Sequence, residues 1–200
     1  MSEQPSWSQF KDLRGHEKAP YFERDNSIFH IAIAQQFSRP FLDEICKIAT
    51  KARKIEDIDQ GKDFLHSLLS PKIGVLYFDQ PSSRTRGSFE AACWFLGMYP
   101  QLFTDLSTSS EVKGETPEDT IRTLSSFGEV MIIRSKTPCL AQRMALKMNH
   151  IGRPVPIINA GSGKDQHPTQ ALLDIYTLHR SFENYGGIDG TTIAMVGDLK

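Results

Sequence analysis

Hydrophobic residues along this chain occur in short runs, each followed by a longer stretch in which they recur at helical spacing. The run Ile73–Phe78 is apolar almost throughout and has the length of a strand, which is typical of a strand buried on both faces. Comparable runs predict further strands at about 101–105, 130–134 and 155–158. Apolar residues at helical spacing predict helices over 84–96, from Thr116, over about 138–148, and from His167.

This alternation of strands and helices indicates the α/β class. Strands separated by helices of about 10–15 residues pair in parallel, and the helices cover both faces of the sheet. In such sheets ligands bind at the carboxyl ends of the strands. Functional residues are therefore expected in the segments that directly follow the strands.

Three segments of different character divide the chain. Residues 1–27 are polar and broken by proline and glycine, and we interpret them as an N-terminal arm. Residues 28–186 hold the strand–helix alternation, and Ser38 is predicted to cap a core-facing helix there. Residues 187–200 contain an apolar run from Thr192 that predicts the first strand of a second, Rossmann-like α/β domain. Because a lone strand cannot bury itself, we expect the sequence to stop inside that domain.

Composition narrows the classes of function. The 200 residues are 39% hydrophobic and 24% charged, and the net charge of -1 creates no overall field that favours nucleic acid. No apolar run approaches the roughly 20 residues of a membrane-spanning helix, and the N-terminus lacks the features of a signal peptide. We therefore expect a cytoplasmic protein without a nucleic-acid or membrane partner. Cys46, Cys93 and Cys139 lie far apart in the sequence, which suits reduced thiols and implies no metal site.

The clearest candidate site follows the strand Ile73–Phe78. The sequence reads Pro-Ser-Ser-Arg-Thr-Arg over residues 81–86, directly before a predicted helix. Hydroxyl groups, a guanidinium and the free backbone N–H groups of a helix N-terminus together suit a phosphate dianion. The alternative is an ordinary serine cap with arginines exposed to solvent.

Three further candidates stand near predicted strand ends. Arg134 ends a strand, so that its guanidinium would project at the carboxyl edge, although a surface salt bridge explains it equally well. Lys113 lies in a polar segment that, taken alone, is typical of a flexible loop. His167 stands at a predicted helix start, and a lone histidine is more often structural. A neutral imidazole at a helix N-terminus can, however, donate a hydrogen bond to a carbonyl oxygen.

Together, three segments resemble the aspartate/ornithine carbamoyltransferase family. They are residues 81–86, residues 113–116 (Lys-Gly-Glu-Thr) and residues 167–174 (His-Pro-Thr-Gln-Ala-Leu-Leu-Asp), and the resemblance extends over about 28–200. It implies a carbamoyl-phosphate-binding domain followed by the first strand of an amino-acid-binding domain. It also implies an enzyme without cofactor or metal, in which the substrate amine attacks the carbamoyl carbon directly. Catalysis would then rest on positioning and on donors to the developing charges.

The resemblance implies roles for individual residues. The phosphate of carbamoyl phosphate would be bound by Ser82, Ser83, Arg84 and Thr85. Arg84 would also stabilise charge on the leaving group. The carbamoyl oxygen would be bound by Thr85, Arg134 and His167, and the carbamoyl nitrogen by Gln170.

A loop of the same family reaches the active site of a neighbouring subunit. Ser109 and Lys113 match that loop, so the resemblance implies a homotrimer with shared active sites, which can itself be part of a larger complex. The residues expected to act in catalysis are Arg84, Thr85, Lys113, Arg134 and His167.

The resemblance favours L-aspartate over ornithine as the acceptor. Residues 113–116 and Thr169 resemble the aspartate group, and the products would be N-carbamoyl-L-aspartate and phosphate, as in pyrimidine biosynthesis. Two alternatives remain: transfer to ornithine or another amine, and a non-catalytic assembly subunit that keeps the fold. Two positions depart from the family pattern. Ser83 replaces the usual threonine, and Glu111 places an acidic group close to Lys113 in the sequence.

Overall fold

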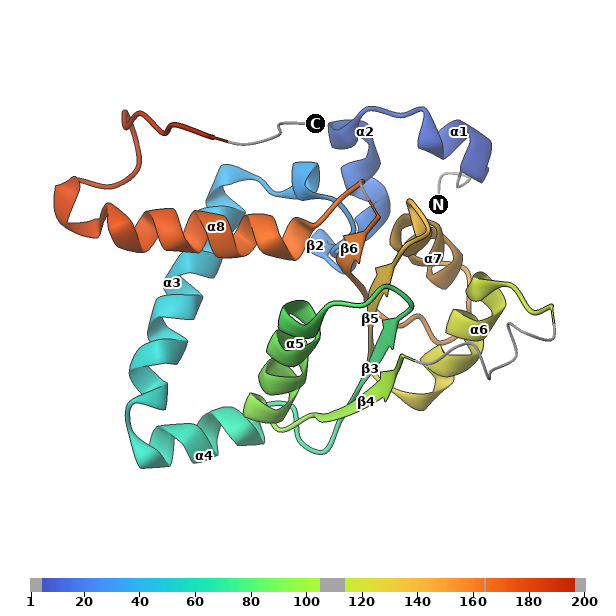
Figure 1. Cartoon of the computed structure of the whole chain (residues 1–200), viewed down its shortest axis with the longest axis horizontal. Coiled ribbons are helices and arrows are strands. Elements are labelled where there is room, and N and C mark those ends of the chain that lie inside the picture. The colour runs from blue at the N-terminus through green and yellow to red at the C-terminus, as the bar shows by residue number, and fades with distance from the viewer. Residues whose placement is uncertain (1–4, 105–113, 164, 197–200) are drawn as a thin grey trace.

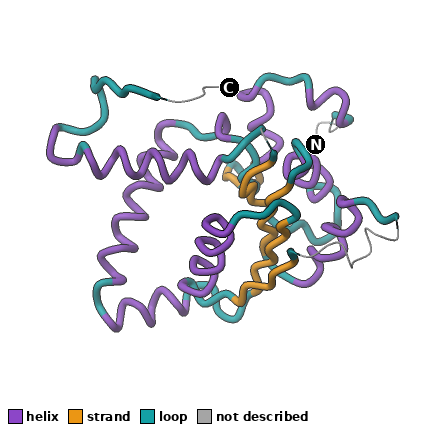
Figure 2. Tube along the Cα trace, in the orientation of Figure 1, coloured by secondary structure: helices purple, strands orange, loops and turns teal. Residues whose placement is uncertain are grey.

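A four-stranded parallel sheet forms the centre of the protein (Figures 1 and 2). The computed structural model describes residues 5–104, 114–163 and 165–196. The strands lie in the order β4 (Tyr99–Phe103), β3 (Ile73–Phe78), β5 (Val130–Ser135) and β6 (Ile157–Ser162). All pairs are parallel, which confirms the predicted α/β class. β3 has its predicted bounds, whereas β6 continues to Ser162, beyond the predicted end at 158.

Helices cover both faces of this sheet (Figure 1). On one side, α5 (Ser83–Phe95) contacts β3 and β4, and α8 (Pro168–Ser181) contacts β6. On the other side, α7 (Leu140–Met148) contacts β5 and β6, and α6 (Pro117–Leu124) packs against α7. All four helices lie where the sequence predicts them. None of the helices in the described ranges is long and apolar enough to cross a membrane.

The strands divide their side chains between two core clusters. Val75 and Tyr77 of β3 belong to the larger cluster, which also includes α7 side chains such as Met144. Leu76 and Phe78 belong to the second cluster, together with side chains of α5. This alternation is that of a strand buried on both faces, as the apolar run predicts.

Residues 5–27 are more ordered than the predicted arm. They form short elements: α1 (Trp7–Lys11), α2 (Gly15–Lys18), a 3₁₀ turn (Ala19–Phe22), β1 (Glu23–Arg24) and, at their end, β2 (Ser27–Ile28). Phe10 and Phe22 are fully buried in the larger core cluster. Two buried aromatic residues this far apart create neither a helical nor a strand period, so the pattern alone did not reveal them.

Two helices connect the N-terminal segment with β3. Ser38 caps α3 (Arg39–Glu56) as predicted, because its hydroxyl accepts a hydrogen bond from the Phe41 backbone N–H at 3.4 Å. The helix does not face the core as expected, since Cys46 is its one buried residue and it packs against α8. α4 (Asp59–Ser67) lies where the sequence suggests a polar connection. Leu65 is its one buried residue, so its sequence has only a weak apolar period.

The predicted strand beginning at Thr192 is not formed within the described residues. Residues 191–196 have no strand structure, and the side chains from Thr192 to Val196 are exposed. A strand needs a neighbour to pair its backbone groups, and the described residues provide none here. The segment leading to it is held to α3, where Arg39 donates two hydrogen bonds to the Asp189 carboxylate at 2.7 and 3.1 Å.

Candidate active site

The order of the strands determines where a site can form. β3 lies between β4 and β5, so the chain leaves β3 to one side and later continues on its other side. Such a reversal opens a crevice at the carboxyl ends of the two strands, where ligands of α/β proteins bind. At these ends Phe78 of β3 pairs with Arg134 of β5. The predicted phosphate-binding segment and Arg134 therefore lie side by side.

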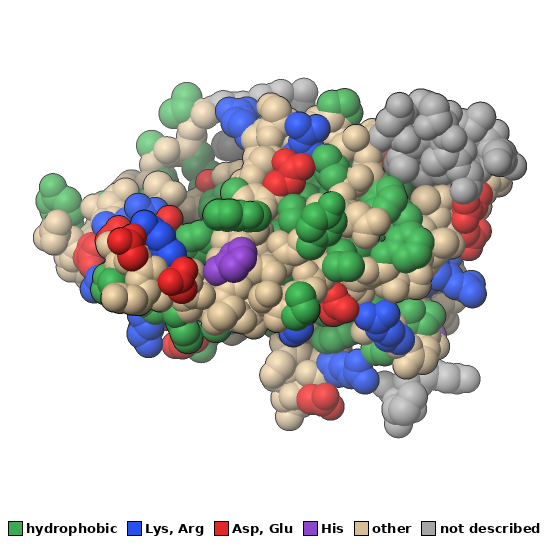
Figure 3. Space-filling view, turned by 90° about the horizontal axis from the view of Figure 1, so that it is seen from below, with side chains coloured by type: hydrophobic (Ala, Val, Ile, Leu, Met, Phe, Trp, Pro, Cys, Tyr) green, Lys and Arg blue, Asp and Glu red, His purple; other side chains and the backbone are tan. Residues whose placement is uncertain are grey.

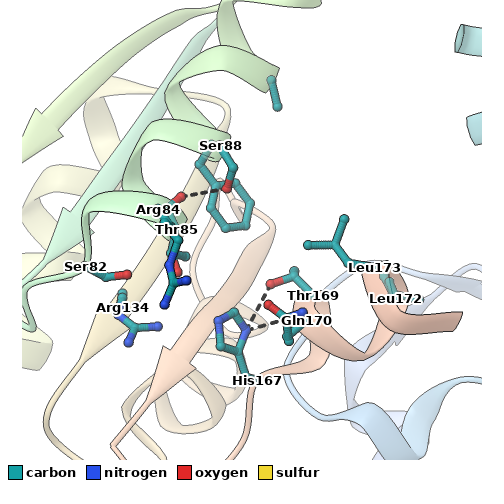
Figure 4. Close-up of a pocket in the computed structure, with 12 residues that line it drawn as sticks. Ser82, Arg84, Thr85, Ser88, Arg134, His167, Thr169, Gln170, Leu172 and Leu173 are labelled. Carbon is teal, nitrogen blue, oxygen red and sulfur yellow. Dashed lines mark hydrogen bonds between the residues drawn. The ribbon is translucent and has the colours of Figure 1, made fainter. Parts of the chain in front are cut away.

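A depression of about 760 Å³ lies at this edge of the sheet (Figure 4). Its walls come from the start of α5, the end of β5 and the start of α8. The residues that line it are Ser82, Arg84, Thr85, Ser88, Phe89, Ala92, Arg134, His167, Thr169, Gln170, Leu172 and Leu173.

Most of the predicted site residues meet in this depression. They are Ser82, Arg84, Thr85, Arg134, His167 and Gln170. Ser83, the first residue of α5, is not among the lining residues, and its side chain is exposed. Ser109 and Lys113 lie outside the described residues.

The first turn of α5 supplies hydrogen-bond donors. Ser82 is the cap residue, yet its hydroxyl makes no capping bond. The first helical hydrogen bond is donated by the Arg86 N–H to the Ser82 carbonyl at 3.1 Å, so the preceding N–H groups have no partner within the helix. Ser82 therefore does not act as an ordinary side-chain cap, although Arg84 and Arg86 are exposed, as the alternative expects. The hydroxyl and the N–H groups remain available to an anion.

The two arginines of this segment have different surroundings. Arg84 lines the depression, and its guanidinium has no hydrogen-bond or ion-pair partner among the described residues. Arg86 does not line the depression, and its Nε lies 3.7 Å from the Glu90 carboxylate on the next turn of α5. Arg84 is thus the free cation of the pair.

Arg134 projects from β5 into the depression, as Figure 4 shows. Its Nη1 donates to the Ala160 carbonyl at 2.9 Å, and its buried Nε has no partner among the described residues. Burial lowers the pKa of its guanidinium. No carboxylate of the described residues pairs with it, so the alternative of a surface salt bridge is not observed. The neighbouring Gly161, at φ +115°, leaves room for the guanidinium, because a Cβ there would collide with Nη1.

His167 caps α8 with its imidazole. Its Nδ1 accepts a hydrogen bond from the Gln170 backbone N–H at 3.4 Å and lies 3.3 Å from the Thr169 hydroxyl. With Nδ1 as acceptor, we assign the ring proton of the neutral form to Nε2. Burial, and then the charge of Arg134, lower the pKa of His167, while Asp174 opposes this effect. The imidazole is therefore neutral near pH 7 and can donate from Nε2.

Further lining residues were not identified from the sequence. Ser88, Phe89 and Ala92 follow Thr85 on one face of α5, and this helical spacing was the available signal. Leu172 and Leu173 of α8 form the apolar wall on the other side. Gln170 lies between the polar and apolar parts of the depression, and its amide nitrogen donates to Asp174 at 2.9 Å. Its carbonyl oxygen thus remains available as an acceptor.

The charges of the site suit an anion. Two guanidinium groups and a helix N-terminus converge on the depression, and no acidic residue is among its described lining. Thr85, Arg134 and His167 line the same depression and can donate hydrogen bonds to a carbonyl oxygen bound beside the anion. The arrangement can therefore hold a phosphate and polarise a neighbouring carbonyl.

Comparison with known proteins gives consistent matches. A family model of the aspartate/ornithine carbamoyltransferase carbamoyl-P binding domain matches residues 30–180. The aspartate carbamoyltransferase catalytic subunit of Methanocaldococcus jannaschii is 46% identical over 158 residues, which are 79% of this chain and 49% of that protein. The chloroplastic aspartate carbamoyltransferase 1 of Pisum sativum is 38% identical over 187 residues, 92% of this chain and 45% of that protein.

A solved structure agrees with these relatives. Aspartate transcarbamoylase from Trypanosoma cruzi, in complex with carbamoyl phosphate, superposes with a TM-score of 0.74 at 39% identity. The match covers 86% of this chain and 52% of that one. The chain thus spans about half the length of the relatives it matches.

Proposed function

Because this chain belongs to the aspartate/ornithine carbamoyltransferase family, we propose that its depression binds carbamoyl phosphate for carbamoyl transfer to an amino acid. The observation that carries the proposal is the meeting of the α5 N-terminus, Arg84 and Arg134 in one depression. The Trypanosoma cruzi relative, whose structure contains carbamoyl phosphate, supports it.

The phosphate group is held by the first turn of α5. Ser82, Thr85 and the free N–H groups donate hydrogen bonds, and Arg84 provides a guanidinium that can bind two phosphate oxygens. Ser83 contributes through its backbone N–H, since its side chain does not line the depression. When the carbamoyl–phosphate bond breaks, charge accumulates on the phosphate, and Arg84 stabilises that charge.

The carbamoyl group lies toward β5 and α8. Arg134, Thr85 and the Nε2–H of His167 donate to its oxygen, which becomes more negative as the amine attacks the carbon. The Gln170 carbonyl accepts a hydrogen bond from the carbamoyl nitrogen. The reaction needs no covalent intermediate, because the amine replaces phosphate directly. Positioning and charge stabilisation supply the rate enhancement.

The proposed acceptor is L-aspartate. The relatives described above are aspartate carbamoyltransferases, which supports aspartate over ornithine, and the proposed reaction is a step of pyrimidine biosynthesis. A non-catalytic assembly subunit is the alternative of another class. The intact set of donors in the depression argues against that alternative, because a site without function would have lost some of them.

We also propose a cytoplasmic homotrimer with active sites shared between subunits, which can itself be part of a larger complex. Hydrophobic side chains gather on the face seen in Figure 3. Exposed hydrophobic residues of α4, α5 and β4 include Phe64, Trp94 and Tyr99, and Leu68, directly after α4, is also exposed. Exposed apolar patches often mark protein interfaces. Ser109 and Lys113 are proposed to act in the neighbouring subunit's site, and residues 28–186 and 187–200 are proposed to belong to separate domains.

An assay of the full-length protein tests the reaction. The protein is incubated with carbamoyl phosphate and either L-aspartate or L-ornithine, and the carbamoylated products and phosphate are measured. N-carbamoyl-L-aspartate is the expected product. Carbamoylated ornithine as the product would show that ornithine, and not aspartate, is the acceptor. Carbamoyl phosphate that raises the thermal midpoint without any product would favour the non-catalytic alternative.

A further inference from the structure

Asp79 joins the two halves of the depression without lining it. Its Oδ2 accepts a hydrogen bond from the Ser135 hydroxyl at 2.6 Å, and its Oδ1 accepts one from the Lys136 backbone N–H at 2.7 Å. Its own backbone N–H donates to the Arg134 carbonyl at 3.1 Å. These bonds tie the first residue after β3 to Arg134 and the two residues that follow it.

Ser135 extends the connection to the third segment of the site. It is fully buried, and its Oγ also accepts a hydrogen bond from the Thr137 backbone N–H at 3.0 Å. Its carbonyl accepts one from the Gly163 N–H at 2.8 Å, in the turn between β6 and His167. The segments that follow β3, β5 and β6 are thus linked around one buried serine and one carboxylate.

We propose that Asp79 is a positioning residue, which holds the phosphate-binding segment in register with Arg134 so that one carbamoyl phosphate reaches both. This inference rests on the proposed function. Its physical basis is the carboxylate itself, which accepts two short, charge-assisted hydrogen bonds from the end of β5. Residues 79–82 lie between β3 and α5, and among the described residues the Asp79 N–H is their one backbone donor to Arg134, so the carboxylate contacts add to a single backbone bond there.

The ligand provides a test that separates positioning from general stability. Inorganic phosphate needs only the start of α5, whereas carbamoyl phosphate must reach that helix and Arg134 together. Weakening the Asp79 contacts should therefore reduce affinity for carbamoyl phosphate while leaving affinity for phosphate nearly unchanged. A residue that merely supports folding would change both affinities together or neither.

Asp79→Asn is the informative variant, because the amide keeps the size of the side chain and loses one acceptor and the charge. Ser135→Ala removes the same contact from the other side. Asp43→Asn is the matched control: Asp43 pairs with Arg39 at 2.8 Å and does not line the depression. Affinities for carbamoyl phosphate and inorganic phosphate are measured by calorimetry on each purified protein, well below its unfolding midpoint.

We expect Asp79→Asn and Ser135→Ala to weaken carbamoyl phosphate binding by about tenfold or more, with phosphate binding changed by less than about twofold. Asp43→Asn should match the wild type. Equal losses for both ligands, or an unchanged preference for carbamoyl phosphate, would overturn the positioning role. If the wild-type protein itself does not prefer carbamoyl phosphate over phosphate, the proposed function fails first.

Discussion

Arg84 and Arg86 stand two positions apart at the start of α5 and should differ sharply in importance. Arg84 lines the depression without a partner among the described residues, whereas Arg86 lies 3.7 Å from Glu90. We predict that Arg84→Ala lowers kcat of the full-length enzyme by about 100- to 1,000-fold, the usual effect of losing a donor to developing charge. Arg86→Ala should change it by less than about twofold. Steady-state kinetics measure kcat for both variants. A wild-type rate for Arg84→Ala would show that Arg84 has no role in the reaction.

Gly161 is the position where one added methyl group should damage the site. Its φ is +115°, and a Cβ there would collide with the Arg134 guanidinium. Gly186 is a matched control, because its φ is +87° and no atom lies within 4 Å of a Cβ built there. Alanine at either position should lower the free energy of unfolding by about 1–3 kcal/mol through backbone strain.

Only Gly161→Ala should also lose affinity for carbamoyl phosphate, because only there is a binding residue displaced. Urea unfolding measures the first effect and calorimetry the second. If both alanine variants bind carbamoyl phosphate like the wild type, the observed position of Arg134 is not required for binding.

Elements with a capping residue and a regular apolar period were predictable from the sequence. Ser38 caps α3 as expected, α6 begins directly after Thr116, and the run Ile73–Phe78 forms β3 with its predicted bounds. α4 was not predicted, because it buries only Leu65 and its period is masked by polar residues. The ordered structure of residues 5–28 was not predicted, because it depends on burial against elements that are distant in the sequence. Such contacts produce no local apolar period.

His30 attaches the N-terminal segment to the sheet, and its burial leads us to predict that the free energy of unfolding depends on pH. It is fully buried, its Nδ1 accepts a hydrogen bond from the Ile157 N–H at 3.0 Å, and its Nε2 lies 3.2 Å from the Asn149 side-chain oxygen. Burial lowers the pKa of His30 from 6.5 to about 4, although Asn149 acts in the opposite direction. The unfolded chain binds a proton near pH 6.5, whereas the folded chain does not until about pH 4. The free energy of unfolding should therefore decrease as the pH is lowered through this range, by up to about 3 kcal/mol in total.

The comparison with His30→Gln isolates this contribution, because glutamine keeps a polar side chain and does not titrate. Between about pH 7 and about pH 5, the wild type should lose about 2 kcal/mol more stability than the variant in urea unfolding. His167 has a lowered pKa in both proteins, so its contribution cancels. An equal loss in both proteins would assign the pH dependence to other groups.

For the molecule as a whole, the sequence predicted that the site lies at the carboxyl edge of the sheet. It did not predict the contacts between neighbouring strands at that edge. The strand–helix alternation predicts a parallel sheet with ligands at its carboxyl edge. Any order of parallel strands produces that same alternation, so it does not reveal that β3 lies beside β5. The contact between Asp79 and Ser135 and the collision avoided at Gly161 both depend on neighbouring strands. Only the three-dimensional arrangement brings such residues together.

A homotrimer with shared sites predicts that two inactive variants become active when mixed. In the proposed assembly, Arg84 comes from one subunit and Lys113 from its neighbour. A complete site forms where a Lys113→Ala subunit supplies the depression and an Arg84→Ala subunit lies next to it. If equal amounts of the two full-length variants reassemble at random, about one quarter of the sites should regain wild-type activity.

The matched control mixes Arg84→Ala with His167→Ala. Both residues line the depression of a single chain, so every site in this mixture lacks one of them whichever subunits are neighbours. Specific activity before and after reassembly is compared for the two mixtures, with the trimer verified by its hydrodynamic mass. Recovery in the first mixture alone is expected, because only there do the two defects lie on different subunits of one site. Equal inactivity of both mixtures, with reassembly demonstrated, would place Lys113 and Arg84 in sites that are not shared.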